Sequence, residues 1–332
     1  MTIKDGNISV RVSEFGQWFD CQQRWDFEYG GYYNGGRILV PRTLHTRLVD
    51  GTAYGEGAAT WHATGDMDLA KQAVVDSYSK YCTELDKNNI PYTVEDLAEQ
   101  IQDVYYTLER QASIAPKLSL TDPELELTCE FPEYRGITLT LIGHVDGFEN
   151  VDGVRRIIEF KKRDRELWNP MIVHKSRQVL WYPVLYNSTT AHFCDEVIFD
   201  ETITGPSNPV KYNQNGSVSK VQSCHWKDYE NACKAAKQVP DPDVLEKLKN
   251  KRWHQRTYVP ITPTKFHETQ LEMLSAVEQF IDFLVAVRAP VRNPQKSRCP
   301  GCTFNEVCDV PTDHELIEAL FNIKQGDRYA IG

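Results

Sequence analysis

A glutamate and a lysine alternate with apolar residues in one short stretch of the chain, IIEFKKR at residues 157–163. The isoleucines and Phe160 predict a β-strand, and side chains two residues apart on a strand point to the same face. Glu159 and Lys161 are therefore expected to share a face. An exposed strand with a cross-strand salt bridge would also explain such a pair, so its meaning depends on the residues around it.

A second carboxylate, Asp146, precedes Glu159 by thirteen residues in the segment GHVDGF. Its flanking glycines predict a strand end, so Asp146 is expected beside Glu159 on a neighbouring antiparallel strand. Two carboxylates that meet repel each other unless a cation joins them, and hard oxygen ligands suit Mg²⁺ or Mn²⁺. A lysine beside such an ion can stabilise developing charge. These residue types indicate metal-dependent hydrolysis of a phosphodiester.

The elements that must position these residues follow one another between residues 124 and 203. Alternating apolar residues and the turn segments PEYRG and ENVDG predict the order β-β-β-α-β. The strands are expected at 124–131, 137–148, 154–163 and 195–203, and the helix at 169–187.

Four regions are expected in the chain. Residues 124–202 form the α/β core, and a polar insertion follows at 203–225. An N-terminal helical region covers 1–123, with its first 30 residues helical. A C-terminal helical region covers 226–332, with helices near 226–253 and 265–288.

The spacing Asp146-x12-Glu159-x-Lys161 on this segment resembles the PD-(D/E)xK nuclease superfamily. The next helix narrows the resemblance, since Gln178-x3-Tyr182 is similar to the Q-x3-Y motif of RecB-like nucleases. These two side chains are four residues apart and share one helix face. The resemblance implies that they orient this helix beside the active site and contact the substrate.

The resemblance also implies a restriction-endonuclease-like fold and roles for the strand residues. Asp146 and Glu159, with the Phe160 carbonyl, are expected to bind one or two Mg²⁺ or Mn²⁺ ions. Lys161 is expected to assist the attacking water and the transition state.

One family motif departs from the pattern. RecB-like nucleases carry a helical histidine, as G-x3-H, which contributes a metal ligand. Here Gly51-x3 ends on Gly55, followed by Glu56, while His62 lies two helical turns along. Glu56 or His62 could replace the missing ligand; alternatively, His62 is a surface or capping histidine.

Three of the nine cysteines are clustered near the C-terminus as Cys299-x2-Cys302-x5-Cys308. With Cys21 in the first helix, they resemble the iron–sulfur ligands of CRISPR-associated RecB-like exonucleases and AddB-type helicase–nucleases. The resemblance implies a 4Fe-4S cluster that joins the N-terminal and C-terminal helical regions as a structural staple. Four thiolates can also bind zinc, and their spacing does not separate the two metals.

The chain carries a net charge of −10, so a nucleic-acid site would require a local basic patch. Three segments could supply one: residues 162–165, 245–256 and 291–298. In the second segment, Trp253 is expected to stack on a base. No apolar run approaches the ~20 residues that cross a bilayer, and no signal peptide is recognisable, so we expect a cytoplasmic protein.

Together these features predict a metal-dependent DNA exonuclease that acts on single-stranded ends in recombination, repair or phage DNA metabolism. A catalytically weakened DNA-binding or assembly subunit is one alternative, and a CRISPR spacer-processing factor is another. A helicase, a recombinase or a CRISPR adaptation protein are the expected protein partners, and no membrane contact is expected.

Overall fold

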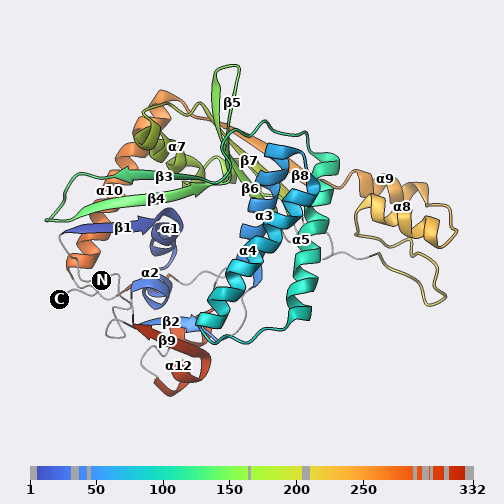
Figure 1. The fold of residues 1–332 in the computed structure, drawn as a ribbon, viewed down its shortest axis with the longest axis horizontal. Helices are drawn as coiled ribbons and strands as arrows, with labels where there is room; N and C mark the ends of the chain where they lie inside the picture. The colour runs from blue at the N-terminus through green and yellow to red at the C-terminus, as the bar shows by residue number, and fades with distance from the viewer. Residues whose placement is uncertain are drawn as a thin grey trace.

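The computed structural model of the chain describes residues 6–30, 37–42, 46–163, 166–203, 210–286, 290–293, 299, 302–309 and 314–325. These residues form a mixed α/β fold (Figure 1). Their strands make a four-stranded, a three-stranded and a two-stranded sheet.

The four-stranded sheet contains the strand with the predicted catalytic residues. Its order is β5 (Gly147–Val151), β6 (Val154–Arg163), β7 (Glu196–Ile203) and β8 (His254–Pro260). β6 and β7 run parallel, and the outer pairs are antiparallel. A parallel pair needs a crossover connection, which here consists of α6 (Pro170–Val173) and α7 (Arg177–Thr190).

The three-stranded sheet pairs β4 (Thr138–Val145) with β3 (Leu125–Glu130) on one side and β1 (Asn7–Arg11) on the other. The prediction of one strand over residues 137–148 is therefore wrong. The chain bends at Asp146, and β4 and β5 on the two sides of the bend pair with different strands. The bend places the Asp146 side chain between the two sheets.

Helices cover both faces of the four-stranded sheet. On one face lie α3 (Thr46–Thr64), α4 (Met67–Lys87) and α5 (Val94–Ile114), and their apolar residues pack on Ile158, Phe160 and Ile198 (Figure 1). The larger core lies on the other face, where α1 (Val12–Asp20), α7 and α10 (Pro263–Val285) pack together. Local signals explain two of the helix starts: Asp66 caps α4, and Thr262 caps α10 ahead of Pro263.

The expectation of uniformly helical end regions is wrong in several places. Before α1 the chain forms β1, and after α1 come α2 (Gln22–Trp25) and a π-helix (Asp26–Gly30). The predicted helix at 226–253 is two helices, α8 (Trp226–Ala235) and α9 (Pro242–Lys249). Pro240 and Pro242 separate them, because proline interrupts helical hydrogen bonding.

Segments from the two ends of the chain pair in the two-stranded sheet. β2 (Arg37–Pro41) pairs with β9 (Phe321–Gln325), which follows α12 (His314–Leu320). Phe27 packs at 5.4 Å from Phe304, just before α11 (Asn305–Cys308), and Phe304 stacks on Phe321.

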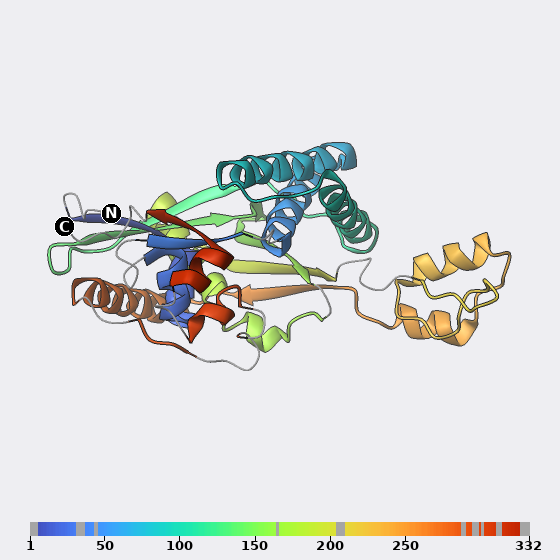
Figure 2. The same cartoon turned by 90° about the horizontal axis from the view of Figure 1, so that it is seen from below.

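Residues 210–252, which contain α8 and α9, form a satellite module between β7 and β8. Figure 2 shows the module standing away from the sheets and their covering helices. The module has a small apolar core of its own, which consists of Val218, Cys224, Tyr229, Ala232, Cys233 and Leu248. None of the described helices is long and apolar enough to cross a membrane.

Candidate active site

Glu159 and Lys161 point to the same face of β6, as their alternation predicts. Lys161 Nζ donates a hydrogen bond to Glu159 Oε2 at 2.7 Å. From α7, Gln178 Nε2 donates to the same oxygen at 2.9 Å and to Tyr182 Oη at 3.0 Å. The four side chains therefore form one connected group around Glu159, which is only 1% exposed.

Asp146 reaches this group from the bend between β4 and β5. Its Oδ2 accepts a hydrogen bond from the backbone N–H of Phe160 at 2.6 Å. The N–H and C=O of one strand residue point to the same side of the strand, so the Phe160 carbonyl lies on the same edge of β6 as Asp146. The three groups predicted to bind metal are thus brought to one edge of β6.

Burial and mutual repulsion disfavour ionisation of the two carboxylates. Burial raises the pKa of Glu159 to about 8; Lys161 lowers it in part, and Asp146 adds repulsion. Burial also raises the pKa of Asp146, against the opposing effects of Lys161 and the Phe160 N–H. Burial lowers the pKa of Lys161, but the two carboxylates outweigh it, so the lysine stays protonated. The single ammonium group of Lys161 does not offset burial and the repulsion from Asp146, so Glu159 stays largely protonated near neutral pH.

The donor set fits a hard divalent cation. Glu159 Oε1 is buried and has no hydrogen-bond partner among the described residues, whereas Lys161 and Gln178 both donate to Oε2. A cation at this oxygen would satisfy it and restore the ionised form. The described residues hold no group of three or more His, Cys, Asp or Glu arranged to bind a metal ion. Two carboxylates and a carbonyl suit Mg²⁺ or Mn²⁺, which keep several waters and bind substrate phosphates.

At the position of the family histidine, Gly55 faces the site directly. A Cβ atom built on Gly55 would lie 3.1 Å from Asp146 Oδ1. Glu56, the next residue, forms an ion pair with Lys80 at 3.4 Å. The residue at the position of the family histidine therefore lies in close contact with Asp146 and supplies no side-chain ligand.

His62 is not the surface or capping residue that was one alternative, because it is 1% exposed. Its Nδ1 accepts the Leu118 N–H at 2.9 Å, and its ring stacks on Phe160 at 4.9 Å. Burial lowers the pKa of His62 to about 3, so it is neutral. Phe160 projects from the opposite face of β6 to Glu159, which places His62 in the core on that side and away from the carboxylates.

A family comparison agrees with this geometry. The model of the PD-(D/E)XK nuclease superfamily matches residues 12–309, nearly the whole chain. The chain belongs to the PD-(D/E)XK nuclease superfamily. The match includes the sheet, the helices on its two faces and the satellite module between β7 and β8.

Similar solved structures are distant. A structure of SSO0001 is 13% identical, with 80% of this chain and 85% of that chain covered and a TM-score of 0.34. A phage related exonuclease from Haemophilus somnus 129PT is 17% identical, with 58% and 70% covered and a TM-score of 0.28. Scores this low carry no argument about function. A search of curated proteins finds no match.

Glu124 is a member of the site that the sequence did not single out. It precedes β3, and its backbone N–H donates to the Asp146 carbonyl at 3.4 Å. Partial desolvation raises the pKa of Glu124 to about 7, and Glu56 and Asp146 add repulsion, although the side chain keeps solvent contact. No local pattern marks this residue, because its proximity to Asp146 depends on the pairing of β3 with β4.

The cations that follow Lys161 do not form a free DNA-binding surface. Lys162 is bound to Asp50 of α3 at 2.9 Å, with its side chain 10% exposed. Arg163 is bound to the buried Glu201 at 2.6 Å, and its guanidinium lies 3.8 Å from the Trp168 ring centroid. Both expected contacts are replaced by internal ion pairs, and Arg165 lies outside the described residues.

The second basic segment, 245–256, also differs from expectation. Trp253 is 4% exposed, so the prediction that it stacks on a base is wrong. It packs instead on His225 and against Arg110. In the segment 291–298, Arg292 pairs with Asp309 at 2.6 Å, and residues 294–298 lie outside the described part of the chain.

The four cysteines proposed as cluster ligands are all described. Cys302 N–H donates to the Cys299 carbonyl at 3.0 Å. Burial raises the pKa of the Cys308 thiol, and so do the nearby thiols of Cys21 and Cys302. Thiols from both ends of the chain therefore approach one another, although none of the described groups is arranged as a metal site.

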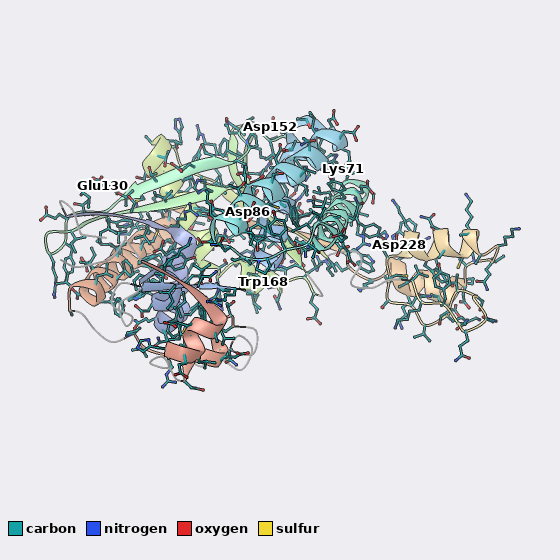
Figure 3. All side chains as sticks on the ribbon, turned by 60° about the horizontal axis from the view of Figure 1, so that its bottom comes forward. Lys71, Asp86, Glu130, Asp152, Trp168 and Asp228 are labelled. Carbon is teal, nitrogen blue, oxygen red and sulfur yellow. The ribbon has the colours of Figure 1, made fainter. Side chains whose placement is uncertain are left out.

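A cavity of about 940 Å³ opens beside Gln178 and Tyr182. It runs between α1, the start of α7 and α10. Its cationic lining residues are Arg24, Lys175, Arg177 and Lys265. Trp168 also lines this cavity, and Figure 3 labels it. The cavity is therefore continuous with the side chains that touch Glu159.

Proposed function

We propose that this chain is a metal-dependent DNA exonuclease that acts on single-stranded ends. The observation that carries the proposal is the pair of buried carboxylates, one with an unpartnered oxygen, beside a protonated lysine. An apolar core would exclude such a pair, and a structural ion pair would satisfy both oxygens. Hydrolysis of a phosphodiester is the chemistry that this group of residues suits best.

Asp146, Glu159 and the Phe160 carbonyl would hold the divalent cation, which would supply charge neutralisation for the scissile phosphate and acidify bound water. Lys161 donates hydrogen bonds from beside Glu159, where it can orient the attacking water and stabilise negative charge on the phosphate. Gln178 fixes the Glu159 carboxylate through Oε2 and leaves Oε1 free. Tyr182 in turn positions Gln178.

The cavity supports single-stranded DNA as the substrate. Lys175 and Lys265 can contact backbone phosphates, whereas Arg24 and Arg177 pair with Glu28 and Asp20. The Trp168 ring can stack on a base. The cavity volume of about 940 Å³ suits a few nucleotides of one strand.

We also propose that Cys21, Cys299, Cys302 and Cys308 bind a 4Fe-4S cluster that staples the two ends of the chain. The donor set consists of four cysteine thiols, and the two thiols that influence Cys308, those of Cys21 and Cys302, come from both ends. Anaerobically purified protein should contain iron and acid-labile sulfide, and Cys302→Ser should lose both. Cys82→Ser is the matched control, because Cys82 lies on α4. A colourless protein with bound zinc would contradict the iron assignment.

A second function is favoured by one observation, the absence of a side-chain ligand at Gly55, which lies against Asp146. Without a third side-chain ligand, the site could bind DNA without cutting it, as part of an assembly with a helicase or recombinase. A CRISPR spacer-processing factor would be a related case, with an adaptation protein as its partner.

The test is digestion of DNA labelled at the 5′ or 3′ end, single- or double-stranded, with Mg²⁺, Mn²⁺ or EDTA. Wild-type protein should release one labelled end only with metal, and Glu159→Ala and Lys161→Ala should abolish the release. Glu126→Gln, at an exposed glutamate of β3, is the matched control and should cut normally. Binding without cutting under all conditions would overturn the exonuclease and support the second function.

A further inference from the structure

The satellite module differs from the rest of the chain in charge. Residues 210–252 contain nine lysines and arginines but only five aspartates and glutamates, a net charge of +4. The whole chain carries −10, so the remainder carries −14. A positive unit on a negative protein attracts polyanions locally, whatever the net charge of the molecule.

Three of the nine cations lie on the outer face of α8 or just after its end. The module core uses Tyr229, Ala232 and Cys233 on one side of this helix. Lys227 and Lys234 are seven residues, or two turns, apart on the opposite side, about 10 Å from each other. Lys237 follows at the helix end and is exposed. This basic row therefore faces away from the module core.

The two acidic residues of α8 do not neutralise the row. Asp228 turns towards the body, where it pairs with Arg110 at 3.3 Å (Figure 3). Glu230 pairs with Lys249 of α9 at 3.9 Å. Of the lysines in the described module, only Lys220 and Lys249 form ion pairs, with Asp241 and Glu230.

The module is attached by an ordered joint. Arg110 of α5 has a side chain 3% exposed, and it donates to the Ile203 carbonyl at the end of β7. Its guanidinium lies 4.8 Å from the ring centroid of Trp253, at the start of β8. Arg110 thus contacts α8 and the chain on both sides of the module, at the end of β7 and just before β8. The basic row is therefore held at a defined place outside the active site.

We propose that the outer face of α8 binds the phosphate backbone of double-stranded DNA. The inference rests on the proposed function only in taking DNA as the substrate. Lysines supply point charges without base readout, which suits a duplex of any sequence. Single-strand binding requires exposed aromatic rings, and of the described aromatic residues in the module only Tyr212 is largely exposed. The module therefore holds the duplex while a single-stranded end enters the cavity.

The test is the binding of a fluorescein-labelled duplex in EDTA, measured by anisotropy over a salt series. Lys227→Glu/Lys234→Glu should lower duplex affinity at least about tenfold and reduce the slope of log affinity against log salt by about 2. Lys87→Glu/Lys324→Glu is the matched control, with the same change in net charge on other exposed elements. Its duplex affinity should stay within about twofold of the wild type.

Three outcomes would overturn the proposal. Equal losses in the two double variants would indicate a general charge effect. An unchanged salt slope for the module variant would exclude phosphate contact, and a larger loss for a single strand than for the duplex would assign the face to single strands. Lys234→Gln/Lys237→Gln repeats the test with exposed residues if the first variant unfolds. Because EDTA prevents cutting, a duplex-binding result stands even if the exonuclease proposal fails.

Discussion

Two buried carboxylates on neighbouring strands have opposite environments. Glu159 projects from β6 towards α7, whereas Asp200 of β7 lies opposite Phe160 in the register and projects towards α5. Both are at most 1% exposed. Burial alone would raise the pKa of each, yet the two groups shift in opposite directions.

Asp200 has partners on both oxygens. Oδ1 accepts from Gln111 at 3.0 Å and lies 2.8 Å from His254 Nε2, while Oδ2 accepts from Arg256 at 2.7 Å. Burial raises its pKa, but His254 and Arg256 outweigh burial and lower it overall. Glu159 receives both of its side-chain donors, Lys161 and Gln178, on one oxygen, and burial raises its pKa to about 8. A fully satisfied buried acid is structural; a half-satisfied one is placed to receive a ligand.

The comparison predicts its largest effect in catalysis. Glu159→Gln keeps the shape of the side chain but removes the charge that would bind the cation, so kcat/KM on labelled DNA should fall by about 10³-fold or more. Asp200→Asn, the same change on the other face, should leave kcat/KM within about tenfold at a temperature where the protein is folded. Equal losses in the two variants would remove the distinction between the faces.

The free energy of unfolding should depend strongly on Asp200 and little on Glu159, the reverse of the order expected for kcat/KM. Asp200→Ala leaves Arg256 buried without its partner, so the free energy of unfolding should fall by about 3–5 kcal/mol. Glu159→Gln should be neutral or stabilising above pH 5, because the wild-type acid is held protonated. Urea unfolding in EDTA measures both variants. A destabilised Glu159→Gln would show that its ion pair with Lys161 holds the fold together.

A smaller effect should separate the two glutamines that touch these acids. Gln178→Ala removes a donor that orients Glu159, so metal affinity should weaken by about 10–100-fold. Gln111→Ala removes the equivalent donor to Asp200 and should leave metal affinity unchanged. Isothermal titration calorimetry with Mn²⁺ measures the metal affinity of both variants. Equal Mn²⁺ affinities in the two variants would contradict a positioning role for Gln178.

The smallest effect lies in the pH dependence of stability without metal. The folded pKa of Glu159 is about 8 and its ordinary value is 4.5, so its contribution is complete below pH 4.5 and is lost as pH rises to 8. Unfolding in EDTA should therefore become easier over this range, by up to about 1 kcal/mol per pH unit. The pKa of Asp200 is lowered, so its contribution is lost only in acid. Glu159→Gln should reduce the pH dependence of the free energy of unfolding between pH 5 and 8. An unchanged pH dependence in this variant would show that another group takes up the proton.

Local periodicity accounts for the parts of the site that the sequence predicts well. Alternation on a strand puts Glu159 and Lys161 together, and helical spacing does the same for Gln178 and Tyr182, as their hydrogen bonds confirm. The β6 boundaries also match the prediction, because its apolar and charged residues alternate clearly.

The remainder depends on packing between distant segments. The sequence predicts that Lys162 and Arg163 belong to a DNA-binding patch. Only the tertiary fold shows that Asp50 and Glu201 lie close enough to form ion pairs with them. β8 was missed because its inward residues include Gln255 and Thr257, which conceal the usual apolar alternation. The close approach of Gly55 to Asp146 could not be predicted either, since it depends on how α3 crosses the bend at Asp146.

The pairing of β2 with β9 has a consequence for the order of events during synthesis. Ile38 meets Lys324, so this pair cannot form before residue 324 has left the ribosome. β1 likewise waits for β4. Such non-local pairings slow folding. A nascent chain that already contains Asp146, Glu159 and Lys161 therefore still lacks the β2–β9 pair, so the site residues are synthesised well before this pairing can form.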